Sequence, residues 1–107
     1  MVKPLNQQSA PPETAGAEPD PTRLSGADVR AITFRKPRFG HRGYDEEQVD
    51  IFLDWVADSL DAGEPIPPAR VHDVSFGKPG LNRRGYREQD VDAFLSRIEA
   101  AARHAAR

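Results

Sequence analysis

Two stretches of the chain combine dense positive charge with one bulky apolar side chain, which suits contact with an anionic surface. Residues 34–43 carry four bases and no acid, and residues 76–87 carry four bases and again no acid. Phe39 lies in the first stretch and Leu81 in the second. The bases are Arg35, Lys36, Arg38, Arg42, Lys78, Arg83, Arg84 and Arg87. Charge segregated in this way indicates that both loops meet something negative.

The formal net charge of the chain is nevertheless −2, because acidic residues gather elsewhere. Between residues 45 and 64 the sequence has eight acids and no Lys or Arg, namely Asp45, Glu46, Glu47, Asp50, Asp54, Asp58, Asp61 and Glu64. An acidic run repels nucleic-acid phosphates, and the sequence has no basic recognition helix. We therefore expect no nucleic-acid partner, and binding of nucleic acid through the basic loops is the weakest alternative.

The basic loops belong to a unit that occurs twice. Residues 24–56 align without a gap on residues 66–98, and 13 of these 33 positions are identical. A fixed period of this length indicates one supersecondary unit that has been copied. Units of about 40 residues are at the lower limit for independent folding, so the copies should pack on each other or on a partner. We assign repeat 1 to residues 23–64 and repeat 2 to residues 65–107.

The first 22 residues differ from the repeats in composition. They hold five of the ten prolines in the chain and few apolar side chains, so we expect residues 1–22 to form a disordered tail. They contain no apolar run typical of a signal peptide, and no later segment has the length and hydropathy of a membrane span. The chain has no cysteine, which excludes disulfides and thiolate metal sites. These features predict a cytoplasmic protein.

Each repeat should contain a short helical turn, the basic loop and a longer amphipathic helix, which makes the protein all-α. Ser25 is suited to cap the first short turn, and Asp45 is suited to cap the first long helix, which Gly63 should end. Apolar residues recur at helical spacing along both long helices and form one stripe on each. The stripe residues are Val49, Phe52, Leu53, Val56, Leu60, Val91, Phe94, Leu95 and Ile98.

The two stripes are natural packing partners for each other. The connection between the long helices is long enough for either parallel or antiparallel packing, and the sequence does not choose between them. Each stripe also has the spacing of a coiled coil, so pairing with another chain leaves a homo-oligomer open.

The sequence offers no catalytic or metal-binding pattern. His41, His72 and His104 are isolated and occupy non-equivalent positions in the two copies. We find no metal-ligand spacing, phosphate-binding glycine motif or nucleophile elbow. We therefore expect no enzyme, no metal and no cofactor.

Both repeats resemble the DivIVA family of bacterial cell-division and polar-growth scaffolds. The family signature is a short helix, a Phe, a basic loop and Gly-Tyr-Asp, followed by an acidic stretch, Val-Asp or Val-Asn, and Phe-Leu. Repeat 1 carries Phe34, Arg42 and the run GYDEEQVDIFL over residues 43–53. Repeat 2 carries Phe76, Arg84 and the run GYREQDVDAFL over residues 85–95, with Arg87 in place of the Asp. The resemblance covers roughly residues 24 to 100.

The resemblance implies a non-enzymatic scaffold or adaptor that binds the inner face of the cell membrane at the septum or pole. In the family, an apolar residue beside a base inserts into the bilayer at the loop tip, and a coiled coil beyond the domain builds the oligomer. The implied partners are anionic lipids and proteins of the division or growth machinery. The implied membrane-binding residues are Arg35, Lys36, Arg38, Phe39, Arg42, Lys78, Leu81, Arg83 and Arg84. The main alternative is a soluble protein–protein adaptor that uses the surface around Ile51 and Trp55.

Overall fold

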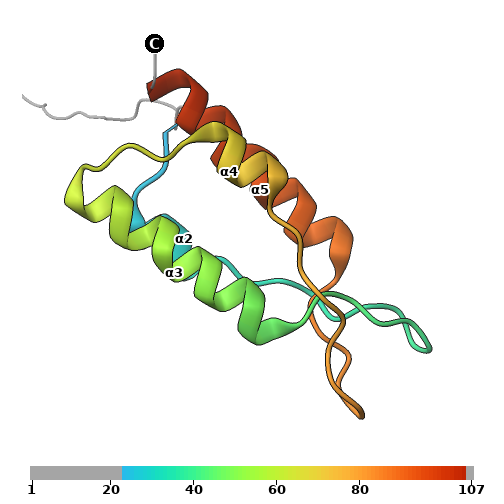
Figure 1. Cartoon of the computed structure of the whole chain (residues 1–107). Helices are drawn as coiled ribbons and strands as arrows, with labels where there is room; N and C mark the ends of the chain where they lie inside the picture. The colour runs from blue at the N-terminus through green and yellow to red at the C-terminus, as the bar shows by residue number, and fades with distance from the viewer. Residues whose placement is uncertain (1–22, 106–107) are drawn as a thin grey trace, which may run out of the picture.

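The computed structural model describes residues 23–105, which form α-helices joined by extended segments (Figure 1). In chain order the helices are α2 (Gly26–Ala31), α3 (Glu46–Ala62), α4 (Pro68–Asp73) and α5 (Glu88–Ala105). No strand occurs within this part of the chain, so the predicted all-α class is confirmed. The tail predicted for residues 1–22 lies outside the described residues.

The helices of repeat 1 begin and end at residues whose side chains or backbone suit those positions. Ser25 Oγ accepts a hydrogen bond from Asp28 N at 3.1 Å, and Ser25 N donates to Asp28 Oδ2 at 3.0 Å, which forms a capping box for α2. Asp45 Oδ2 accepts from Gln48 N at 3.1 Å and caps α3. Gly63 ends α3 with a φ of +70°, the left-handed conformation that glycine adopts without steric cost.

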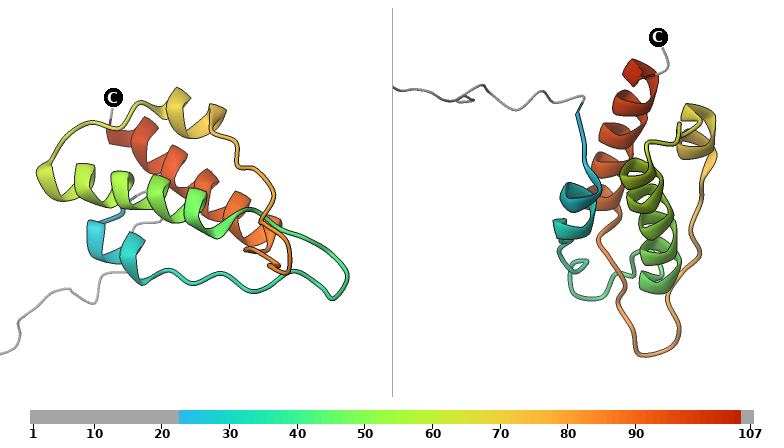
Figure 2. Two further views of the ribbon diagram at one scale, coloured as in Figure 1. Left: turned by 60° about the horizontal axis from the view of Figure 1, so that its bottom comes forward. Right: turned by 90° about the vertical axis from the view of Figure 1, so that its left-hand side faces the viewer.

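The two long helices start side by side and run in the same general direction, which answers the question that the sequence left open. Figures 1 and 2 show α3 and α5 leaving the point where the two extended segments cross, and both then lead away from the loop tips. Each long helix has close backbone contacts with the short helix of its own repeat, α2 with α3 and α4 with α5. The two long helices meet through side chains of a shared core.

Aromatic side chains join the two repeats across this crossing. The ring of Phe34 lies 5.1 Å from the ring of Tyr86 and 6.1 Å from that of Phe94, both in repeat 2. In return, the ring of Phe76 lies 5.4 Å from Tyr44 and 6.0 Å from Phe52, both in repeat 1. The loop of each repeat therefore packs on the long helix of the other. Reciprocal contacts of this kind are those of a symmetric dimer, built here within one chain.

The apolar stripes of both long helices contribute to one core. Leu60 and Leu95 are partly buried at its edge. The buried apolar side chains are Val29, Val49, Phe52, Leu53, Val56, Ala57, Ile66, Val71, Val91, Phe94, Ile98 and Ala102. Burying a side chain the size of valine or isoleucine stabilises a fold by roughly 1.5–3 kcal/mol, so this core is the main source of stability.

Candidate functional site

Backbone hydrogen bonds at the crossing hold the two basic loops together. Tyr44 N donates to Tyr86 O at 2.9 Å, and Tyr86 N donates to Tyr44 O at 2.9 Å, which makes an isolated antiparallel bridge. Gly43 N donates to Arg84 O at 2.8 Å. A Cβ atom at Gly43 would lie 1.7 Å from Tyr86 O, so the close approach of the two segments requires glycine at this position.

The tyrosine side chains add a second pair of reciprocal bonds. The Tyr44 hydroxyl donates to Asp92 Oδ1 at 2.8 Å, and the Tyr86 hydroxyl donates to Asp50 Oδ1 at 2.8 Å. Burial, followed by the bond to the carboxylate, raises the pKa of each tyrosine to about 12. Asp50 and Asp92 therefore fix the start of one repeat's long helix to the loop of the other repeat.

Two arginines of the predicted membrane site also hold the crossing. The guanidinium of Arg42 donates to the carbonyl oxygen of Pro79, and the guanidinium of Arg84 donates to that of Pro37. Both prolines are buried. A carbonyl carries no net charge, so this hydrogen bond does not offset the positive charge of the arginine. The bond does fix each arginine side chain beside the other loop.

Three other predicted membrane-binding residues pair with helix carboxylates near the base of the loops. Arg35 Nη2 lies 2.9 Å from Asp90 Oδ1, and the Arg35 backbone N donates to Asp90 Oδ2 at 2.9 Å. These bonds lower the pKa of Asp90 to about 2. Lys36 Nζ lies 2.6 Å from Glu46, and Lys78 Nζ lies 2.7 Å from Glu88. The structure therefore separates these three bases from the residues at the tips.

The tips bring the remaining predicted residues to one end of the molecule. The side chains of Phe39 and Leu81 are 96% and 88% exposed. Neither side chain folds inward onto the helix pair. Both tips line one open hollow, whose residues are Phe39, Gly40, His41, Arg42, Leu81, Asn82, Arg83 and Arg84. Within residues 23–105, the one acid that Arg83 contacts is Glu46, at the long distance of 4.0 Å.

Each tip is a tight turn that the chain forms locally. His41 N donates to Arg38 O at 2.9 Å in the first turn, and Arg83 N donates to Gly80 O at 3.2 Å in the second. Asn82 has a φ of +65°, and asparagine tolerates this region better than most residues. Sequence reasoning missed Asn82 and His41 as members of the hollow. Their place in the same turns as Phe39 and Leu81 was the signal available.

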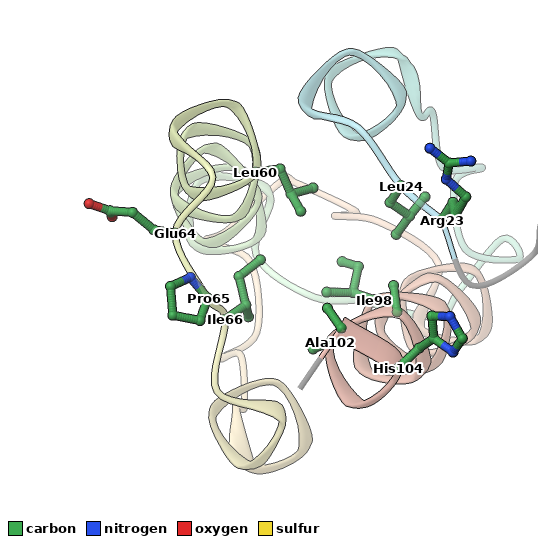
Figure 3. Close-up of a pocket in the computed structure, with 11 residues that line it drawn as sticks. Arg23, Leu24, Leu60, Glu64, Pro65, Ile66, Ile98, Ala102 and His104 are labelled. Atoms are coloured by element: carbon green, nitrogen blue, oxygen red, sulfur yellow. The ribbon is translucent and has the colours of Figure 1, made fainter. Parts of the chain in front are cut away.

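A second hollow lies at the other end of the helix pair (Figure 3). It has a volume of about 240 Å³, and Leu24, Leu60, Ile66 and Ile98 point toward one another across it. Ala102 occupies the position in repeat 2 that Leu60 occupies in repeat 1. The smaller side chain leaves part of the space unfilled. The hollow is lined mostly by apolar side chains, and Arg23, Glu64 and His104 also border it.

No group of three or more His, Cys, Asp or Glu side chains within residues 23–105 is placed to hold a metal ion. No helix in the same range combines the length and apolar character needed to cross a bilayer.

Fold and site define an all-α protein in which two crossed repeats present a pair of basic, apolar-tipped loops at one end. Part of the chain is similar to the cell wall synthesis protein Wag31 of Mycobacterium tuberculosis strain H37Rv, with 54% identity over 37 residues. The Wag31 proteins of Mycobacterium leprae and Mycolicibacterium smegmatis match to the same extent. The match covers 35% of this chain and 14% of each Wag31 sequence. No family model and no solved structure matches the chain.

Proposed function

We propose that this protein is a non-enzymatic, DivIVA-like scaffold or adaptor that binds anionic membrane through its two loop tips. The observation that carries the proposal is the exposure of Phe39 and Leu81 at the same end of the molecule, where they line one hollow together with Arg42, Arg83 and Arg84. Lipid acyl chains would take up the apolar side chains, and anionic headgroups would bind the bases.

The expected energies suit reversible binding. A side chain such as Phe39 or Leu81 gains roughly 1.5–3 kcal/mol when it leaves water completely. Each base near an anionic surface adds about 1 kcal/mol. The crossing holds both tips in fixed positions, so insertion of one tip raises the local concentration of the other at the membrane.

The partial similarity to the cell wall synthesis protein Wag31 supports a role in cell wall synthesis. The repeated Gly-Tyr, Val-Asp and Phe-Leu motif supports the DivIVA resemblance over a larger part of the chain. We accordingly place the protein at the cytoplasmic face of the cell membrane, with division or growth proteins as partners. Time-lapse imaging of a fluorescent fusion would distinguish septum from pole, and a diffuse signal throughout the cell cycle would contradict the proposal.

Co-sedimentation with vesicles tests the membrane contact directly. The wild-type protein should enrich on vesicles of anionic lipid at low salt, and Phe39→Ser/Leu81→Ser should reduce this enrichment about tenfold or more. Ile51→Ser is the matched control, because Ile51 is 62% exposed but lies on α3, away from the tips. Absence of wild-type enrichment would exclude the membrane role and favour the soluble adaptor. A gel shift with DNA or RNA tests the nucleic-acid alternative.

A further inference from the structure

The exposed side of α3 carries one large apolar residue among acidic residues. Ile51 is 62% exposed and projects from the side of α3 opposite the buried stripe residues. Trp55 lies one helical turn further on and is partly buried against Phe52, whose ring centroid is 5.6 Å away. We call this surface the α3 outer face, and its residues are Glu47, Ile51, Asp54, Trp55 and Asp58.

The α3 outer face has no counterpart in repeat 2. The equivalent positions of α5 hold neither an acid nor a large apolar side chain, and their residues are Gln89, Ala93, Ser96, Arg97 and Ala100. Several buried stripe positions, in contrast, hold the same or a similar residue in both repeats, as with Val49 and Val91. Core packing therefore does not require the difference between the two outer faces. The acidic and apolar surface is a feature of α3 alone.

Most of the negative charge on this face is not neutralised within the described residues. Asp58 and Asp61 share Arg30, at 2.8 Å and 2.6 Å. Glu47 and Asp54 form no ion pair with any residue in the described range 23–105, and α3 itself contains no base. Arg70 is a second cation that borders the face, because its guanidinium lies 4.3 Å from the centre of the Trp55 ring. Arg70 covers the ring and leaves Ile51 as the exposed apolar contact.

We propose that the α3 outer face binds the loop tips of a second copy of this chain. The tips carry the complementary chemistry, with Phe39 and Leu81 exposed beside arginines. The apolar tip residues would cover Ile51, and the tip guanidiniums would lie against Glu47 and Asp54. The contact would bury apolar area of both surfaces away from water and bring opposite charges together. Burial gives the contact affinity, and the charge pairs set its orientation.

Such a contact joins copies head to tail. The tips and the α3 outer face are different parts of the molecule, so a bound copy still has one free tip pair or one free outer face. Contacts between different surfaces continue into open chains unless the rotation closes a ring. If the tips also bind lipid, which rests on the proposed function, a membrane-bound copy keeps its α3 outer face available for the tips of the next copy.

Two variants, each with one surface altered, test the contact. The tip variant carries Arg38→Glu, Phe39→Ser, Leu81→Ser and Arg83→Glu, and it keeps Arg42 and Arg84, which hold the crossing. The face variant carries Glu47→Lys, Ile51→Ser and Asp54→Lys. In sedimentation velocity at low salt, the wild-type protein should form oligomers that grow with concentration, and each variant alone should be monomeric. An equimolar mixture should form a one-to-one complex, because each partner retains one intact surface.

Controls exclude misfolding and general charge effects. Circular dichroism and urea unfolding should show both variants folded as the wild-type protein is. Gln89→Lys/Ser96→Lys places the same charges at the equivalent positions of α5 and should leave association unchanged. High salt should weaken wild-type association about tenfold or more, because exposed charges are screened.

The proposal is overturned if the mixed variants do not associate, even if the α3 outer face binds some other basic protein. It is also overturned if the face variant associates as strongly as the wild-type protein. The vesicle assay separates this result from the proposed function, because the face variant keeps its tips. If the protein binds vesicles but the tip variant and the face variant do not associate, only the head-to-tail contact is contradicted. If the two variants associate but the protein does not bind vesicles, only the membrane role is contradicted.

Discussion

Tyr44 and Tyr86 occupy equivalent positions in the two repeats and bind each other through both backbone groups, at 2.9 Å in each direction. Each tyrosine hydroxyl then bonds to an aspartate of the opposite repeat. The pair therefore joins the start of both long helices to both loops. These contacts add to the stability that the apolar core supplies, and they also set where the loop tips lie.

Loss of either tyrosine hydroxyl should weaken the fold moderately. Tyr44→Phe removes the bond to Asp92, whose carboxylate is exposed enough to be hydrated instead. We expect the free energy of unfolding to fall by about 1 kcal/mol in urea denaturation, and Tyr86→Phe should have a similar effect. Unchanged stability in both variants would show that the cross-repeat hydroxyl bonds contribute nothing.

Alkaline pH should destabilise the wild-type protein through the same tyrosines. The folded protein holds the pKa of Tyr44 and Tyr86 at about 12, above the ordinary value of 10.0. Between these values the folded state binds more protons than the unfolded state, so the free energy of unfolding falls as pH rises from 10 to 12. Below this range the two tyrosines make no pH-dependent contribution.

The double variant Tyr44→Phe/Tyr86→Phe serves as the control for the alkaline effect. Lysines titrate in the same range, so the comparison of wild type with variant isolates the tyrosines. Urea unfolding at several alkaline pH values should show a shallower decline for the variant. Parallel declines would contradict the assignment.

Acidic pH should weaken the contact between Arg35 and Asp90. Hydrogen bonds from Arg35 lower the pKa of Asp90 from 3.8 to about 2. As pH falls, Asp90 therefore takes up its proton in the unfolded state before it does so in the folded state. The stabilisation from the Arg35–Asp90 contact is complete above the ordinary pKa of 3.8 and is lost as pH falls toward 2. Asp90→Asn should remove this part of the acid dependence, measured as thermal midpoint against pH. An identical pH profile for the variant would contradict the prediction.

A methyl group at Gly43 should disrupt the crossing. The added Cβ would lie 1.7 Å from the backbone oxygen of Tyr86. That oxygen also accepts a hydrogen bond from Tyr44 N, so it has little room to move. We expect Gly43→Ala to cost at least about 3 kcal/mol in urea unfolding. Gly80→Ala is the matched control: it has no atom within 4 Å of its added Cβ, and its stability should change by less than about 0.5 kcal/mol. Equal stability of the two variants would contradict the proposed role of Gly43.

The basic residues of the two loops look equivalent in the sequence, but the tertiary structure divides them into two groups. Composition places Arg35, Lys36 and Lys78 with the tip residues, because all of them lie in the same short basic stretches. In the folded protein these three pair with carboxylates of the long helices. The sequence does not show which basic residues lie next to the helices and which lie at the loop tips. The folded structure makes this distinction and so identifies the basic residues that remain near Phe39 and Leu81.

Local patterns determined the helices and their ends. The apolar stripe predicted both long helices, and the caps at Ser25, Asp45 and Gly63 are present as expected. These interactions join residues within about one turn of each other, so the order of residues is sufficient to predict them. The sequence also determined that two equivalent units exist.

The partner of each loop was decided only by the tertiary structure. Gln48 has the position of a capping-box residue, yet its Oε1 accepts a hydrogen bond from Gly77 N at 2.7 Å in the other repeat. Arg35 and Asp90 are 55 positions apart in the chain. Because both repeats have nearly the same loop and the same stripe, the pattern suits packing within a repeat as well as between repeats. The crossing of the backbones selects the second arrangement, and it also sets the long helices parallel and places both tips at one end.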